Sequence, residues 1–293
     1  MTFIRPGVAM ADKQSEEGLA AEIVRQNIEH HDLDAPLYDL SHPNLHHLLE
    51  RRRLRADLDL LEELLGDRHP VRAVDVGAGT GRLSLQFVRR GWDVTAVDSS
   101  EGMLAIARAR YERAGGPGRL ELVRATAEEF LDAAGGEFDL FAFSSVLHHL
   151  PDPLAVVRMC AGRLSEGGCI YITQEPMPVE GPRRTRTARI VKVLDEIVRA
   201  PQQVYRQVYR RARRLPRSRA GELVDYHVER GIDLPALERT LAELGVRRRR
   251  LATYADRKTA LVAYLDDHLF RTPNRYFRYI GQRTGVGGGE RDG

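Results

Sequence analysis

Apolar residues follow two spacings along the chain, and their alternation predicts a sheet flanked by helices. Short apolar runs, typical of buried strands, cover residues 71–76, 93–97, 119–124, 138–143 and 168–174. Between these runs, apolar residues recur every three or four positions, as on one face of a helix, over residues 45–65, 82–90, 101–113 and 154–164. Strands that alternate with helices favour an α/β fold with a doubly wound, mostly parallel sheet.

A different pattern begins after Pro178. Residues 183–214 have a helical and strongly basic pattern, which Pro201 is expected to interrupt. A further helix is expected over residues 234–244, and two closing antiparallel strands over residues 247–255 and 259–265. The pattern therefore divides the chain into four segments, 1–66, 67–176, 177–232 and 233–293, of which the last ends in a glycine-rich tail.

The composition excludes several classes of protein. With 42% hydrophobic and 30% charged residues, the 293-residue chain can bury a sizeable core and is not expected to be disordered. It has neither the run of about 18 apolar residues that spans a membrane nor the apolar segment of a signal peptide. The two cysteines, Cys160 and Cys169, form neither a disulfide scaffold nor a four-ligand zinc site. We therefore expect a cytoplasmic protein without a metal.

The charge is unevenly distributed. The formal net charge is +3, yet thirteen basic and two acidic residues lie between Arg183 and Arg219. Such a segment fits a solvated helix that covers a site, a helix on an anionic membrane surface, or a channel for phosphate groups. The sequence leaves these three interpretations open.

The strongest chemical signal is the glycine-rich run at residues 74–81, Val-Asp-Val-Gly-Ala-Gly-Thr-Gly. Glycines between a strand and a helix let the backbone approach a ligand and adopt positive φ, and the amides at the helix start suit a polar group. A dinucleotide fingerprint has a third Gly or Ala where this chain has Arg82. The spacing, together with the lack of a Tyr-x-x-x-Lys site, disfavours a nicotinamide oxidoreductase.

Two further signals fall at the carboxyl ends of predicted strands, where open α/β sheets bind ligands. Asp98 ends the second strand and can accept both hydroxyls of a ribose; it can alternatively cap the next helix, with Ser99 and Ser100 as competing caps. Ser144, Ser145, His148 and His149 follow the fourth strand. These side chains are expected to meet the glycine-rich loop at one edge of the sheet.

The order of these motifs resembles that of class I S-adenosylmethionine-dependent methyltransferases, in particular the branch that acts on small molecules. The glycine-rich run is similar to their first motif, Asp98 to their ribose-binding acid, residues 138–150 to their fourth motif and residues 164–168 to the loop before their fifth strand. The resemblance covers about residues 70–175. It implies a Rossmann-like fold with a seven-stranded, mostly parallel sheet. In this fold 1–66 would be a helical lid, 67–176 the cofactor-binding core, 177–232 a helical cap over the acceptor pocket, and 233–293 the last helix and hairpin.

The resemblance implies S-adenosyl-L-methionine as cofactor, S-adenosyl-L-homocysteine as product, and a set of cofactor-binding positions. These are Asp75, Gly77, Ala78, Gly79, Gly81, Asp98, Ser99, Met103, Thr126, Ala127, Glu128 and Ser144. The chain departs from the family at Thr126, because an acid usually stands there. Recognition of the adenine would then rest on Thr126, the Ala127 backbone or Glu128.

The reaction implied is an in-line attack of an acceptor nucleophile on an already activated methyl group, so the protein mainly supplies alignment. A hydroxyl acceptor also has to lose a proton, and His148, His149 and His227 are the candidate bases. Tyr38 and His42 of the lid, with Arg183, Tyr205 and Tyr209 of the basic segment, are candidates for the lid or acceptor pocket. The arginines there predict an acidic or phosphorylated small-molecule acceptor.

Two alternatives remain beside a small-molecule methyltransferase. The basic segment suggests an RNA methyltransferase, although the chain has neither an RNA-binding module nor an Asp/Asn-Pro-Pro-Tyr run, so nucleic acid is not the expected partner. It equally suggests a non-catalytic protein that binds a membrane or a partner through its cap. The methylated atom (O, N or C), peripheral membrane contact and a homodimer are left open. The composition resembles that of a high-GC bacterium, for which natural-product or sugar tailoring in secondary metabolism is the expected setting.

Overall fold

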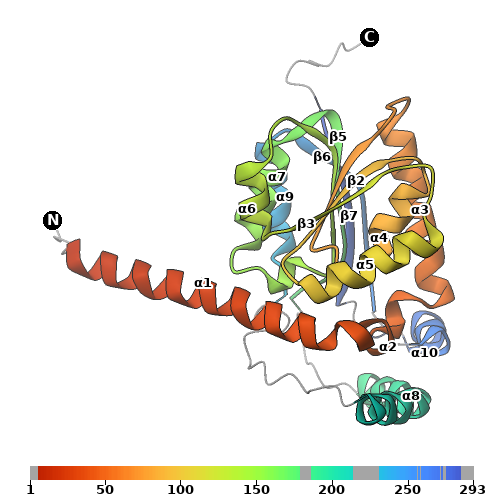
Figure 1. Ribbon diagram of the computed structural model, residues 1–293. Helices are drawn as coiled ribbons and strands as arrows, with labels where there is room; N and C mark the ends of the chain where they lie inside the picture. The colour runs from red at the N-terminus through yellow and green to blue at the C-terminus, as the bar shows by residue number, and fades with distance from the viewer. Residues whose placement is uncertain are drawn as a thin grey trace.

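The chain builds one seven-stranded sheet with the strand order β3-β2-β1-β4-β5-β7-β6 (Figure 1). The computed structural model describes residues 6–178, 186–213 and 231–284, except 256, 258, 271, 273 and 274. The first five strands pair in parallel, and β7 runs antiparallel to both β5 and β6. The strands are β1 (Arg72–Val76), β2 (Asp93–Asp98), β3 (Leu120–Arg124), β4 (Phe138–Ser144), β5 (Leu164–Pro176), β6 (Val246–Tyr254) and β7 (Tyr276–Arg283).

Helices cover both faces of the sheet and one of its ends (Figure 1). One face packs against α6 (Ala127–Ala133), α7 (Pro153–Gly162) and α9 (Leu234–Glu243), and the other against α3 (Leu48–Leu65), α4 (Arg82–Val88) and α5 (Glu101–Ala114). The remaining helical elements lie at the end where the parallel strands finish. They are α1 (Pro6–Asp34), η1 (Ala35–Leu37), α2 (Tyr38–Ser41), η2 (Pro43–Leu45), η3 (Leu147–His149), α8 (Arg186–Ala212), α10 (Ala260–Leu265) and η4 (Asp266–Phe270).

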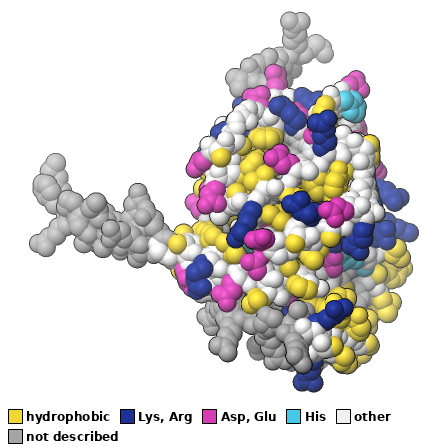
Figure 2. All heavy atoms as spheres, in the orientation of Figure 1, with side chains coloured by type: hydrophobic (Ala, Val, Ile, Leu, Met, Phe, Trp, Pro, Cys, Tyr) yellow, Lys and Arg dark blue, Asp and Glu magenta, His cyan; other side chains and the backbone are white. Residues whose placement is uncertain are grey.

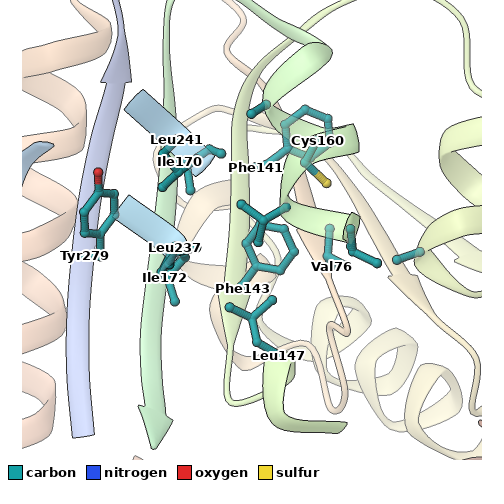
Figure 3. Close-up of a cluster of buried hydrophobic side chains, with 14 of the residues drawn as sticks. Val76, Phe141, Phe143, Leu147, Cys160, Ile170, Ile172, Leu237, Leu241 and Tyr279 are labelled. Atoms are coloured by element: carbon teal, nitrogen blue, oxygen red, sulfur yellow. The ribbon is translucent and has the colours of Figure 1, made fainter. Parts of the chain in front are cut away.

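Alternating side chains of the central strands divide the core into two layers. In β4, Phe141 and Phe143 join the cluster with α6, α7 and α9, whereas Leu140 and Ala142 join the cluster with α3 and α4. Figure 3 shows the first cluster, in which Phe141 and Phe143 lie beside β5 and α9 side chains. Because these side chains are completely buried, each of the larger ones stabilises the fold by about 1.5–3 kcal/mol. The central strands are thereby held rigidly behind the loops at their carboxyl ends.

The first five predicted strands are confirmed, but the predicted closing hairpin is partly wrong. Residues 246–254 form β6, while the expected strand at 259–265 is the helix α10. Thr259 caps this helix, since its side chain accepts a hydrogen bond from the Val262 amide at 3.4 Å. The second strand of the pair is β7, further along the chain. A short apolar run is compatible with a strand and with a buried helix. Here the cap at Thr259 stabilises the start of a helix.

The expected interruption at Pro201 is also wrong, because α8 runs through it from Arg186 to Ala212. Pro201 lies on the exposed side of this helix. There, the carbonyl group that loses its intrahelical donor can be solvated by water instead. In sequence α8 stands before the last two strands, as expected for a helical cap.

Candidate functional site

The glycine-rich loop between β1 and α4 has left-handed backbone at all three glycines. A Cβ atom on Gly77 (φ +65°) would lie 2.1 Å from Cγ2 of Val146, so the loop after β4 packs directly on this glycine. Gly79 (φ +53°) borders open space. A Cβ atom on Gly81 (φ +69°) would lie 2.7 Å from Cβ of Ala107, so this glycine lets α4 pack on α5. Gly77 and Gly79 therefore shape the site, while Gly81 serves helix packing.

Asp98 links the ends of β2 and the glycine-rich loop. Its Oδ2 accepts a hydrogen bond from the Gly79 amide and its Oδ1 from the Ser100 amide, each at 2.8 Å. The cap of α5 is Ser100, which accepts from the Met103 amide, and not Asp98. Burial raises the pKa of Asp98, although both amides oppose this by stabilising the carboxylate. Each oxygen keeps a further lone pair, which can accept a ribose hydroxyl.

Asp75, at the end of β1, is a buried carboxyl with one unsatisfied oxygen. The Ser84 hydroxyl donates to its Oδ2 at 2.5 Å, while its Oδ1 has no hydrogen-bond partner among the described residues. Burial raises the pKa of Asp75 to about 6, against the opposing effect of Ser84. A buried acceptor without a donor is costly, so this oxygen fits a ligand that carries a donor, above all a cationic amino group.

A cavity of about 1060 Å³, partly open to solvent, lies over these two acids. It is lined by the expected residues Tyr38, Asp75, Gly77, Ala78, Gly79, Asp98, Ser99, Met103, Thr126, Ala127, Glu128, Ser144 and His149. The described candidates that do not line it are His42, Gly81, His148, Tyr205 and Tyr209. Arg183 and His227 lie outside the described residues. The structure therefore brings most of the expected cofactor positions together around one cavity, but no residue of α8.

Thr126, the position that departs from the family pattern, caps α6. Its hydroxyl accepts from the Glu129 amide at 3.2 Å, while its own amide donates to the Glu129 carboxylate at 2.8 Å. This reciprocal capping box holds the start of α6 at the cavity wall. The Thr126 side chain is thereby engaged in the helix cap, and Ala127 and Glu128 are the neighbouring lining residues left for an adenine.

The two adjacent histidines of η3 have different surroundings. His148 is buried, and its Nδ1 lies 2.8 Å from Oε2 of Glu175. The completely buried Glu175 carboxylate also accepts from the amides of Val146 at 2.6 Å and Leu147 at 2.9 Å. His149 lines the cavity. His148 thus helps to hold the loop after β4, and His149 is the histidine of this pair that faces the site.

Three cavity residues of α1 were not expected from the sequence, Val24, Asn27 and His31. His31 packs edge-to-face against His149, with ring centroids 5.2 Å apart, and burial lowers its pKa to about 3. Its Nδ1 and the Oδ1 of Asn27 are buried without a hydrogen-bond partner among the described residues. Val24, Asn27 and His31 are spaced by three and four positions, a signal that marks one helix face. These orphan atoms point to a polar ligand in the cavity.

Two acids of the N-terminal helical segment bond the glycine-rich loop and the start of α5. Asp32 Oδ1 accepts from the Ser100 hydroxyl at 2.6 Å and from the Gly102 amide at 2.9 Å. Asp39 accepts from the Thr80 hydroxyl at 3.1 Å and pairs with Arg110. These contacts place Tyr38 in the cavity wall.

The expected lid residue His42 lies one layer behind this wall. Its ring stacks on that of Tyr38, with centroids 4.2 Å apart. Its Nδ1 lies 2.9 Å from the backbone oxygen of Tyr38. His42 therefore supports Tyr38 and does not itself line the cavity.

Comparisons with known proteins agree with this geometry. The family model described as "Methyltransferase domain" matches residues 74–172. The ubiquinone biosynthesis O-methyltransferase of Bordetella avium (strain 197N) is 34% identical over 116 residues, which are 40% of this chain and 47% of that protein. The one of Aliivibrio fischeri (strain MJ11) is 31% identical over 127 residues, 43% of this chain and 52% of that protein. The match thus spans about half the length of these curated relatives.

A solved structure shows the same fold over most of the chain. The crystal structure of the [4+2]-cyclase SpnF superposes with a TM-score of 0.52 at 17% identity, over 86% of this chain and 93% of that one. The matched residues 74–172 include the glycine-rich loop and Asp98, which the Gly79 amide contacts. They belong to the seven-stranded sheet described above. Residues 74–172 thus match a methyltransferase domain, and the chain around them has the fold of the solved structure.

Proposed function

We propose that the protein transfers the methyl group of S-adenosylmethionine to a hydroxyl oxygen of a small aromatic acceptor. The observation that carries the proposal is a cavity whose lining includes the glycine-rich loop and Asp98 together with His31, Tyr38 and His149. Rings from α1, α2 and η3 suit an aromatic acceptor. The curated relatives named as O-methyltransferases support oxygen as the methylated atom.

The cofactor fits the polar groups of the cavity position by position. The Asp98 carboxylate would hold the ribose hydroxyls, and the unpaired Oδ1 of Asp75 the amino group of the methionine part. Met103, Ala127 and Glu128 would enclose the adenine. When bound, the cofactor supplies a methyl group that its positive sulfur already activates. The chain's own residues then have to align the acceptor and remove its proton.

His149 is the residue that we propose as the base. An efficient base has a pKa near the working pH, and the pKa of His31, about 3, makes that imidazole a weak one. His31 instead offers a neutral acceptor or donor that orients the hydroxyl beside His149. Held by Asp98 and Asp75, the cofactor would supply the methyl carbon to the acceptor oxygen, and its sulfur would keep the electron pair of the broken carbon–sulfur bond. The hydroxyl proton goes to the imidazole of His149.

The test is methyl transfer from a labelled donor to matched phenols, catechols and amines. His149→Gln should lower kcat on a phenolic acceptor by about 10²–10⁴-fold and remove the acidic limb of the pH profile. The affinity for S-adenosylhomocysteine should change less than about threefold, because the cofactor positions are untouched. His268→Gln, at an exposed position of η4, is the matched control. An unchanged pH profile in His149→Gln, or transfer to amines alone, contradicts the proposal.

The finer expectations about partners stay predictions. An acidic or phosphorylated acceptor would need a cation at the cavity, and Arg82 lines it, whereas Arg183 lies outside the described residues. Five further expectations also stay predictions. They are natural-product or sugar tailoring, a cytoplasmic location, a homodimer, and the RNA-methyltransferase and non-catalytic alternatives.

A further inference from the structure

The helix α8 turns its polar side toward the protein. Its inward residues bond the segment that follows α1: Gln202 donates to the Leu40 carbonyl at 2.8 Å, and Arg206 and Arg210 both pair with Asp34, at 3.0 and 2.8 Å. The Asp34 side chain is buried between them. A surface helix of a globular protein ordinarily buries its apolar stripe. In α8 the arrangement is largely reversed, with Val191 as a buried apolar exception.

The outward side of α8 is apolar and exposed. Its residues recur at spacings of three, four and seven, and each is between 50% and 63% exposed: Ile190, Val193, Ile197, Val204 and Val208. α8 packs beside α10 and η4, which add the exposed side chains of Leu261, Tyr264 and Leu269. We call these eight residues the α8 apolar face. Figure 2 shows hydrophobic side chains gathered in this region, at the lower right. A continuous apolar patch of this kind marks an interaction site.

The charge around the α8 apolar face indicates what covers it. Residues 186–213 contain eight Lys and Arg residues against two acidic ones. Arg189, Lys192, Arg211 and Arg213 are exposed on the same helix. A second copy of the same face would bring these positive charges together, which is unfavourable. An anionic lipid surface attracts them and accepts the apolar side chains.

We propose that the α8 apolar face docks the protein on an anionic lipid bilayer, with α8 lying in the plane of the interface. Among the described residues, no helix is long and apolar enough to cross a membrane, so the contact is a surface contact. Because Arg206, Arg210 and Gln202 hold residues 34–40, the docked helix would lie next to the segment that carries Tyr38 into the cavity. The proposal rests on this surface alone and does not depend on the proposed methyl transfer.

The test is co-sedimentation of the full chain with phosphatidylcholine vesicles, with and without about 30 mol% phosphatidylglycerol. The wild-type protein should sediment with the anionic vesicles and bind the neutral ones at least about tenfold more weakly. The double variant Ile197→Asp/Val204→Asp should lose at least about tenfold in partitioning. The matched control Gln203→Asp/Gln207→Asp adds the same charge to exposed positions of α8 outside the apolar face and should lose less than about threefold.

Folding and self-association are measured on the same samples. All positions changed are exposed, so circular dichroism and the unfolding temperature should match those of the wild type. Equal loss in both double variants shows that charge alone acts, and contradicts a docking face. A different result would show that a second copy covers the face: the wild type is a dimer that does not bind the vesicles, and Ile197→Asp/Val204→Asp is a monomer. Either result, or no binding to anionic vesicles, overturns the proposal.

Discussion

At the scale of single residues, two buried acids at the ends of neighbouring strands are the groups to which we assign the ribose and the amino group of the cofactor. Asp98 is held by two backbone amides, which keep its carboxylate in place before a ligand arrives. Asp75 has one hydroxyl donor and one unpaired oxygen, and burial raises its pKa to about 6. Burial raises the pKa of both acids, and the unpaired oxygen of Asp75 leaves room for a bound cation that would favour its ionised form.

This difference predicts a pH dependence of cofactor affinity. Folding raises the pKa of Asp75 above its unfolded value, so its ionised form destabilises the ligand-free fold above about pH 6, and a cationic amino group relieves this cost. Below about pH 6, Asp75 becomes neutral and the Kd for S-adenosylmethionine should rise by up to about tenfold per pH unit. Calorimetry between about pH 5 and 8 measures this. In Asp75→Asn the affinity should be weaker and nearly independent of pH; a wild-type slope in this variant contradicts the assignment.

At the scale of elements, the end of β5 positions the loop that follows β4. Glu175 takes hydrogen bonds from the amides of Val146 and Leu147 and from the His148 ring, and Val146 in turn packs on Gly77. Ser145, between the strand and this clamp, has a positive φ of 59°. One buried carboxylate therefore sets the placement of both η3 and the glycine-rich loop.

Replacing Glu175 by glutamine tests this clamp. The amide NH₂ group would face backbone donors, leaving buried N–H groups unsatisfied at a cost of about 2–4 kcal/mol in unfolding free energy. Urea unfolding measures the loss, and S-adenosylhomocysteine binding should weaken because Gly77 loses its support. Glu166→Gln, at an exposed position of the same strand, is the control and should stay within about 0.5 kcal/mol of the wild type. Equal stability of the two variants contradicts the clamp.

The elements also show what the sequence can and cannot predict. Each buried strand, and the glycine-rich loop, is encoded by consecutive residues. Periodicity and spacing along the chain were therefore sufficient to predict them. The prediction for residues 259–265 is wrong because a short apolar run fits either period, and only the cap at Thr259 indicates a helix. Gly81 and His148 belong to the right motifs, yet only their packing, on Ala107 and Glu175, shows that they lie behind the cavity wall.

The rest of the site depends on long-range contacts that spacing along the chain does not reveal. Asn27 donates to the carbonyl of His149, 122 positions away, and Asp32 reaches Ser100, 68 positions away. His31 becomes a cavity residue only because α1 packs across the ends of the strands. A polar helix face without a neighbouring motif carries no such information by itself.

At the scale of the whole molecule, the N-terminal segment connects the two surfaces to which we assign functions. Residues 24–45 close the cavity on one side, and Asp34 and Leu40 hold the inward side of α8 on the other. Acceptor entry and surface docking would therefore meet at one end of the sheet. Both proposals place this end of the sheet around a cavity in which Asp98 would hold S-adenosylmethionine.

The most direct measurement is calorimetric titration of the protein with S-adenosylmethionine and S-adenosylhomocysteine. The wild type should bind both with a Kd of about 1–100 μM, and Asp98→Ala should weaken binding at least about 100-fold. Glu101→Ala, an exposed acid three positions away, is the matched control and should bind as the wild type does. Circular dichroism establishes that each protein is folded. A folded wild type that binds neither compound, or an Asp98→Ala variant that binds both undiminished, contradicts a cofactor site at Asp98.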